Sequence, residues 1–374
     1  MTNGLLPEGL RDRLPPYAGA AQNVLRTVLD YVLSHGYRRV QPPLVEFEEE
    51  LAGRLKGTGT RDLFRIVDPV SARTLALRPD ITAQIGRIAT TRLADAARPL
   101  RLGYGGQVLK LRSTQLRPER ELLQAGAELI GTDSVEAAVE VVLVALDALS
   151  SAGVRNITLD LTLPNLVDML AGGAMKLKKD KIDAVRTALD AKDAGGLAAL
   201  GAQAYLPLLA AAGKLPDALA HLRQIDATHI LEPRLAAIEA IAAAVGEKAR
   251  ITLDPTERHG FEYQSWLGFS FFGEAGDGAA LAGEIGRGGS YVIVHVDGRE
   301  EPAIGFSLYL DPLIDAGLGQ NEAKRVFLPL STMPNVAARL RNEGWVTVAA
   351  LSAEDDATAL GCTHQLLNGQ PIAL

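Results

Sequence analysis

Cysteine and aromatic residues are scarce in this chain of 374 residues. The single cysteine, Cys362, cannot form an intrachain disulfide, which excludes a small scaffold held together by disulfides. Only His364 accompanies this thiol at metal-ligand spacing, which is too little for a metal site. We therefore predict that Cys362 is a partly buried structural residue, and we expect neither a metal nor a cofactor.

Long apolar stretches are also lacking. The most apolar helix pattern, residues 139–149, is interrupted by Glu140 and Asp147 and is too short to span a bilayer. No apolar core follows Met1, so the sequence predicts no signal peptide. We expect a cytoplasmic protein without membrane contact.

The chain has no excess of positive charge. Its 45 acidic and 38 basic residues give a net charge of −7, a field that does not attract nucleic acid, so we expect no nucleic-acid partner. What is present is a 47% hydrophobic fraction with 22% charged residues, the balance of a globular protein with an ample core. This length can hold one large domain and one or two smaller ones.

An amphipathic helix is the first predicted element. After Pro15 and Pro16, apolar residues recur at three- and four-residue steps from Tyr17 to Val32, and Gly36 ends the pattern. Asp133, followed by Glu136, predicts a capping box for a second long helix that reaches about residue 152. The other patterns before residue 132 are a strand at 37–47, a hairpin of strands at 63–68 and 74–77, a helix at 81–93, and a long antiparallel pair of strands at 100–111 and 120–131.

Residues 165–247 differ in composition from the rest of the chain. Alanine, leucine and glycine dominate there, and short helical patterns follow one another, which predicts an inserted helical subdomain. Strand patterns resume near Ala249, and the tail shows a strand at 325–330, a helix at 335–342 and a strand at 346–351. The fold class is therefore α+β, a mainly antiparallel sheet flanked by helices. We divide the chain into a core of residues 1–164 and 248–318, a helical insertion at 165–247 and a short C-terminal α/β segment at 319–374.

Six separated strings carry a more specific signal. In order, they are GYRRVQPPLVEFEE, LALRPDITAQIGR, LGYGGQVLKLRSTQLRPERELLQAGAELIG, RHGFEYQ, GRGGSY and AIGFSLYLDPL. Their order and spacing, over roughly residues 5 to 315, resemble the three class II motifs and the histidine-specific segments of the histidyl-tRNA synthetases, a class II aminoacyl-tRNA synthetase family. The resemblance implies a class II core that forms a homodimer near Pro43.

The resemblance also implies a pocket for free histidine. Such a ligand needs an anion for its ammonium group, a cation for its carboxylate, and an acceptor and a donor for its imidazole. Gln124 and Glu128 are four residues apart on one predicted strand, so their side chains share a face. By the resemblance, the ammonium group is bound by Asp80, Thr82 and Gln124, the imidazole by Glu128, Tyr263 and Tyr291, and the carboxylate by Lys110 together with Arg258 or His259.

The residues that handle ATP in that family are missing. Lys110 replaces the motif 2 arginine and keeps its charge without the planar fork. Pro312 replaces the motif 3 arginine that clamps the phosphates, and Tyr309 replaces a closely packed glycine. A proline cannot neutralise a triphosphate, so we predict that this chain makes no adenylate.

A synthetase core that keeps the histidine pocket and loses the ATP site resembles the family of ATP phosphoribosyltransferase regulatory subunits. The resemblance implies no active site in this chain and a hetero-oligomer with a short-form ATP phosphoribosyltransferase catalytic subunit. The chain would activate that enzyme in the first step of histidine biosynthesis and mediate feedback inhibition by L-histidine. Two alternatives remain open at this point: a divergent histidyl-tRNA synthetase, and a free-standing histidine- or tRNA-binding paralogue.

Overall fold

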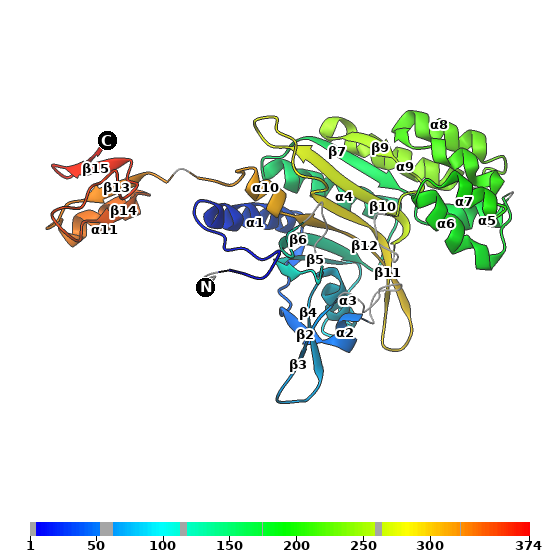
Figure 1. The fold of residues 1–374 in the computed structure, drawn as a ribbon, viewed down its shortest axis with the longest axis horizontal. Helices are drawn as coiled ribbons and strands as arrows, with labels where there is room; N and C mark the ends of the chain where they lie inside the picture. The colour runs from blue at the N-terminus through cyan, green and yellow to red at the C-terminus, as the bar shows by residue number, and fades with distance from the viewer. Residues whose placement is uncertain (1–4, 53–62, 113–117, 174, 259–263, 322) are drawn as a thin grey trace. The chain divides into compact units, whose positions relative to one another are not determined.

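A computed structural model of the protein describes residues 5–52, 63–112, 118–173, 175–258, 264–321 and 323–374 (Figure 1). The chain packs as two compact units, residues 1–319 and residues 320–374. None of the helices in the described part of the chain is both long and apolar enough to cross a membrane.

The larger unit is built on one large sheet. Among the described residues, nine strands pair in the order β1-β5-β6-β12-β11-β10-β7-β9-β8, and only the β1–β5 and β7–β9 pairs are parallel. The prediction of a mainly antiparallel sheet is therefore confirmed. The strands are β1 (Arg38–Arg39), β5 (Leu100–Leu109), β6 (Glu121–Ile130), β7 (Arg155–Thr162), β8 (Gly213–Lys214), β9 (Arg250–Leu253), β10 (Gln264–Glu274), β11 (Gly286–Val294) and β12 (Glu300–Tyr309).

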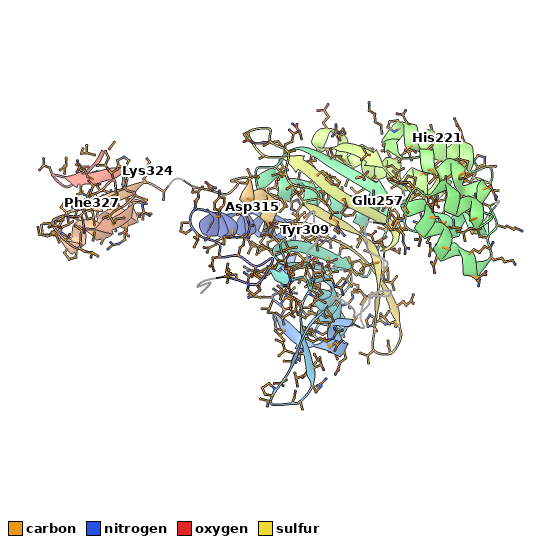
Figure 2. All side chains as sticks on the ribbon, viewed as in Figure 1. His221, Glu257, Tyr309, Asp315, Lys324 and Phe327 are labelled. Carbon is orange, nitrogen blue, oxygen red and sulfur yellow. The ribbon has the colours of Figure 1, made fainter. Side chains whose placement is uncertain are left out.

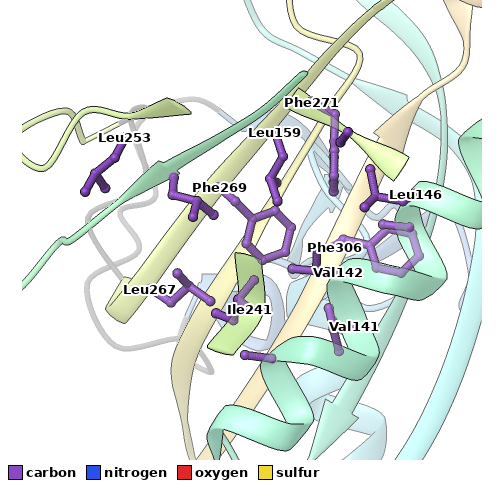
Figure 3. Packing of buried hydrophobic residues seen from close by; sticks show 14 of the residues in the cluster. Val141, Val142, Leu146, Leu159, Ile241, Leu253, Leu267, Phe269, Phe271 and Phe306 are labelled. Carbon is purple, nitrogen blue, oxygen red and sulfur yellow. The ribbon is translucent and has the colours of Figure 1, made fainter. Parts of the chain in front are cut away.

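Two long helices cover one face of this sheet. Helix α1 (Tyr17–Ser34) begins directly after Pro16 and ends before Gly36, whose φ of 83° is favourable for glycine, so the predicted helix is confirmed. Helix α4 (Val135–Ser151) packs its apolar side on the strands. Figure 3 shows Phe269 and Phe306 from two strands lying against Val142 of this helix.

The cap of α4 differs from the prediction. Ser134, not Asp133, is the N-cap: its side chain accepts a hydrogen bond of 3.3 Å from the backbone N–H of Ala137. Both residue types can cap a helix, and the helix begins one residue later than the pattern indicated. The Asp133 interpretation was therefore wrong by one position.

The opposite face of the sheet carries a second, smaller apolar cluster and helix α3 (Thr82–Thr90). Beside it, three short strands pair in the order β2-β4-β3, next to helix α2 (Glu48–Ala52). These strands are β2 (Val45–Phe47), β3 (Phe64–Val67) and β4 (Thr74–Leu77), and the hairpin predicted at 63–77 is confirmed.

The chain between β7 and β9 is mostly helical. Figure 1 shows its helices gathered beside β7 and β9 at one end of the large sheet. They are α5 (Leu166–Gly172), α6 (Ile182–Asp190), α7 (Ala194–Ala199), α8 (Leu215–Ile225) and α9 (Glu232–Val245), with 3-10 turns η1 (Lys179–Lys181), η2 (Gln203–Ala210) and η3 (Gly246–Lys248). The short helix α10 (Asp311–Asp315) follows β12 and completes the unit.

The smaller unit is a four-stranded sheet with one helix. Strands β13 (Arg325–Leu328) and β14 (Val346–Ala349) and helix α11 (Pro334–Asn342) match the predicted strand, helix and strand. The sequence analysis missed a hairpin formed by β15 (His364–Leu367) and β16 (Gln370–Ala373).

Candidate functional site

The α3-side face of the large sheet carries a cluster of buried polar residues. Alternate residues of β6 point to this face, so Gln124 and Glu128 lie on it together, as the spacing predicts. Gln124 is 0% exposed and Glu128 is 1% exposed. A buried carboxyl group in a strand needs partners, and the neighbouring strands supply them.

Two tyrosines hold the carboxyl group of Glu128. The hydroxyl of Tyr104, on β5, donates to Glu128 Oε1 at 2.9 Å, and that of Tyr291, on β11, donates to Oε2 at 2.7 Å. Both rings are almost fully buried. Gly305 lies opposite Glu128 on β12, and a Cβ there would be 1.7 Å from Glu128 Oε2. The carboxyl group therefore requires a glycine at position 305.

Burial raises the pKa of Glu128 to about 8, because the carboxylate has lost its hydration. Hydrogen bonds from Tyr291, Thr82 and Tyr104 favour the anion and partly oppose this shift, while the charge of Asp80 adds to it. The group thus titrates near neutral pH, and a ligand that brings a hydrogen-bond donor or a positive charge would favour its ionised form.

A second acidic group lies at the other end of the cluster. Gln124 donates from Nε2 to Asp80 Oδ2 at 2.8 Å and to Ser307 Oγ at 2.7 Å, while its Oε1 accepts from the backbone N–H of Ile81 at 3.0 Å. The backbone N–H of Thr82 donates to Asp80 Oδ1 at 2.7 Å. The start of α3 and the middle of β6 therefore fix Asp80 in one orientation.

The network is continuous between the two carboxyl groups. Ser307 Oγ and Thr82 Oγ1 lie 2.9 and 3.1 Å from the hydroxyl oxygen of Tyr104, which itself bonds Glu128. A chain of hydrogen bonds thus connects Asp80 to Glu128 through Gln124, Ser307 and Tyr104.

A pocket opens over this cluster; we call it the Glu128 pocket. Its cavity volume is about 20 Å³, room for about one water molecule, so a larger ligand requires the lining side chains to move apart. Gly289 and Gly305 line the pocket, and Gly268 pairs with Gly289 on the next strand; we call these three paired glycines the glycine row. The lining residues are Thr82, Glu128, Gln264, Arg287, Gly288, Gly289, Tyr291, Gly305, Phe306 and Ser307.

Comparisons with known proteins agree with this geometry. A family model described as histidyl-tRNA synthetase matches residues 9–313. The chain is 42% identical to the ATP phosphoribosyltransferase regulatory subunit of Rhodospirillum centenum, over 98% of this chain and 95% of that protein. The chain belongs to the family of ATP phosphoribosyltransferase regulatory subunits.

Solved structures support the fold of this regulatory-subunit family. An ATP phosphoribosyltransferase regulatory subunit/histidyl-tRNA synthetase from Bacillus halodurans superimposes with a TM-score of 0.79 at 23% identity, covering 96% of each chain. The histidyl-tRNA synthetase of Nostoc sp. PCC 7120 gives 0.78 at 18% identity, covering 98% of this chain and 92% of that one. The class II synthetase-like fold is therefore confirmed.

Five of the nine predicted pocket residues of this regulatory-subunit chain come together in the structure. They are Asp80, Thr82, Gln124, Glu128 and Tyr291. His259 and Tyr263 lie outside the described residues.

The other two predicted residues lie elsewhere. Lys110 is four residues beyond Gly106, the cross-strand partner of Gln124, and its backbone pairs with that of Arg120. The backbone N–H of Arg258 donates to Asp190 at 3.0 Å, and its side chain lines a different hollow with Leu163. Neither side chain is among the described residues that line the Glu128 pocket, so their contact with the ligand carboxylate stays a prediction.

The sequence analysis missed three residues of the site: Tyr104, Ser307 and Arg287. Tyr104 lies opposite Gly126 and Ser307 pairs with the same glycine from the other side. The predicted antiparallel pairing of 100–111 with 120–131 contained the signal for Tyr104. Gly126 is two residues from both Gln124 and Glu128 and shares their face, and a residue directly opposite Gly126 lies on that face too. Ser307 and Arg287 depend on long-range pairing that no local pattern contains.

Tyr309, at the end of β12, and Asp315, at the end of α10, are labelled in Figure 2. Both line a second hollow. Tyr309 is 4% exposed, and Pro312 lies in the first turn of α10. The hollow is lined by three carboxylates, Glu119, Asp311 and Asp315, and by no lysine or arginine among its described residues. The described residues also contain no group of three or more His, Cys, Asp or Glu side chains arranged to hold a metal ion.

Proposed function

We propose that this chain is the non-catalytic regulatory subunit of an ATP phosphoribosyltransferase complex. It activates a short-form catalytic subunit in the first step of histidine biosynthesis, and it binds free L-histidine to mediate feedback inhibition. The observation that carries this proposal is the Glu128 pocket, a buried polar pocket in a chain whose relatives are regulatory subunits.

The chemistry of the pocket suits histidine. Glu128 is held by two tyrosine hydroxyls and can accept a hydrogen bond from an imidazole N–H, whose pKa is also near neutral. Asp80, fixed by Gln124 and the backbone of Thr82, supplies an anion for the ammonium group. A hydrogen-bond network connects the two carboxyl groups. One histidine molecule is proposed to contact both, with its ammonium group at Asp80 and its imidazole at Glu128. Tyr263 is proposed as a further contact of the imidazole.

Histidine can inhibit the complex only by binding its inactive arrangement more tightly than its active one. A buried pocket of polar groups supports this role, because closure around a ligand changes the hydrogen bonds of the groups that line it. The pocket and the surface that contacts the catalytic subunit are proposed to be separate.

Two observations argue against the alternative of a working histidyl-tRNA synthetase. Tyr309 and Pro312 stand where that family has a glycine and an arginine, and the hollow beside them is lined by three carboxylates. Two of these carboxylates are paired, Asp311 with Arg13 and Asp315 with Arg11. What opposes adenylation is therefore Pro312, because phosphoryl chemistry requires a cation at the phosphates and a proline supplies none. A free-standing histidine-binding paralogue remains the competing proposal, and a partner transferase distinguishes the two.

The proposed assembly includes a homodimer through the segment around Pro43. The backbone carbonyls of Pro42 and Pro43 accept hydrogen bonds from the buried side chains of Arg78 and Gln84, at 3.0 and 2.7 Å. These hydrogen bonds orient the backbone of the segment, which supports the proposed interface.

We also propose the domain division at 1–164 with 248–318, 165–247 and 319–374. The helices between β7 and β9 support an insertion into the core, and the compact unit of residues 320–374 supports a separate tail segment.

Reconstitution tests the proposal. A short-form transferase from the same genome is assayed alone, with this chain, and with this chain plus L-histidine. We expect activity to rise on mixing and to fall again with histidine. A transferase whose activity and histidine response ignore the added chain would reject the regulatory role and favour the free-standing paralogue.

A further inference from the structure

Arg287 is the one cationic side chain among the described residues that line the Glu128 pocket. It lies on β11, on the same face as Gly289 and Tyr291, because alternate residues of a strand share a face. Its side chain is only 19% exposed. Glu128 is the one acidic side chain among the described residues that line the same pocket, so a largely buried cation beside it is suited to an anionic group of the ligand.

The strand register places Arg287 at one particular end of the pocket. Its cross-strand partner on β12 is Ser307, whose Oγ accepts a hydrogen bond from Gln124. Gln124 also holds Asp80. Glu128, Gly305 and Gly289 lie side by side on three neighbouring strands. Arg287 is two residues from Gly289, on the same face, in the direction of Gln124 and Asp80.

The guanidinium is already held in place. Glu284 binds it as a fork, through Nε to Oε1 and through Nη2 to Oε2 at 2.6 Å, and its Cζ lies 5.9 Å from the centre of the Tyr309 ring. A guanidinium has five N–H donors, and this fork uses two of them. Because the side chain is oriented before a ligand arrives, binding costs little conformational entropy.

We propose that Arg287 binds the α-carboxylate of the amino acid in the Glu128 pocket, an inference that rests on the proposed histidine site. In an α-amino acid the ammonium and carboxylate groups share one carbon, so their two binding groups must be neighbours. Arg287 and Asp80 meet this condition, because Arg287 is the cross-strand partner of Ser307, and Gln124 donates hydrogen bonds to both Ser307 and Asp80. Lys110 lies four residues beyond the cross-strand partner of Gln124, roughly 13 Å along the strand, and fulfils it less well.

The test compares L-histidine with histidinamide, in which a neutral amide replaces the carboxylate. Calorimetric titrations of the full-length chain with both compounds give the preference of each variant for the carboxylate. For the wild type we expect histidine to bind roughly ten to a hundred times more tightly. In Arg287→Met this preference should fall to about one, mainly because histidine binds more weakly.

Matched variants separate recognition from structure. Arg101→Met removes an arginine from a similar fork, with Glu140, on the other face of the sheet, and should keep the full preference. Because Arg287→Met leaves Glu284 without that fork, the double variant with Glu284→Gln is measured as well, and circular dichroism checks that each variant is folded.

The outcomes are distinct. A folded Arg287→Met or double variant that still prefers histidine overturns the inference and leaves the histidine site intact. Equal losses for histidine and histidinamide also overturn it, because they indicate a structural role. A wild type that binds neither compound rejects the histidine site itself, which is a failure of the proposed function.

Discussion

At the scale of single residues, the chemistry of the site depends on Glu128, a carboxyl group with two tyrosine donors and almost no exposure to solvent. Such a group is costly to bury, so its place in a strand that could carry an apolar residue supports the proposed role in binding. We therefore expect the ionisation of Glu128 and the binding of histidine to be linked.

Replacing Glu128 by glutamine tests the role in histidine binding. Glu128→Gln keeps the shape but removes the charge-assisted bond to the imidazole, which should cost about 1.5–3 kcal/mol, or roughly a ten- to hundredfold loss of histidine affinity. We expect activation of the transferase to persist. A complex of this variant that is inhibited at the same histidine concentration as the wild type would show that histidine acts elsewhere.

The raised pKa of Glu128 predicts how stability depends on pH. Because the folded state keeps a proton that the unfolded chain loses, the stability of the wild type relative to Glu128→Gln declines as pH rises from about 4.5 to about 8. The full difference is at most about 5 kcal/mol. Urea unfolding of both proteins at about pH 5 and about pH 8.5 measures it. Parallel pH profiles for the two proteins would contradict the predicted shift.

At the scale of strands, the pocket depends on residues that lack a side chain. Gly305→Ala places a Cβ against Glu128 and should destabilise the fold by about 1–3 kcal/mol or displace the carboxyl group from its tyrosine partners. Gly19→Ala, in α1, meets no atom within 4 Å and should be neutral or stabilising by up to about 1 kcal/mol. Thermal unfolding compares the two. If Gly305→Ala lowered the melting temperature no more than Gly19→Ala, the surrounding residues would be able to accommodate a Cβ at position 305.

Much of this arrangement could be predicted from local patterns. The two-residue period of β6 put Gln124 and Glu128 on one face, and the step pattern from Tyr17 to Val32 gave α1. The β15–β16 hairpin was also predictable, because the Asn368-Gly369 pair is a sequence signal for a two-residue hairpin turn. Both residues have the positive φ that this turn requires. Arg287 was not predictable, because its place in the pocket arises from the pairing of β11 with β12.

At the scale of the whole molecule, we predict that the chain makes no aminoacyl-adenylate. The reason is Pro312, which supplies no cation for a triphosphate, together with Tyr309, which stands where the related synthetases have a glycine. A pyrophosphate-exchange assay with histidine and ATP should give no signal above background. Clear histidine-dependent exchange would restore the synthetase alternative.

The isolated chain is also predicted to form a homodimer. The segment around Pro43 is held by Arg78 and Gln84, and an interface of this isologous type should be large and mainly apolar. Light scattering at micromolar concentration, without the catalytic subunit, should give twice the mass of one chain. A monomer under these conditions would count against the proposed interface.

The glycine row has a consequence for the genetics of the pathway. Every substitution of a glycine adds atoms, and at Gly268, Gly289 and Gly305 the added Cβ would lie 2.4 Å or less from a neighbouring atom. A single base change at the Gly289 or Gly305 codon can therefore place atoms in the lining of the pocket, and where the chain still folds, the proposed histidine site is the part that is changed. We expect a selection for strains that overproduce histidine to recover changes at these glycines as readily as changes at Glu128.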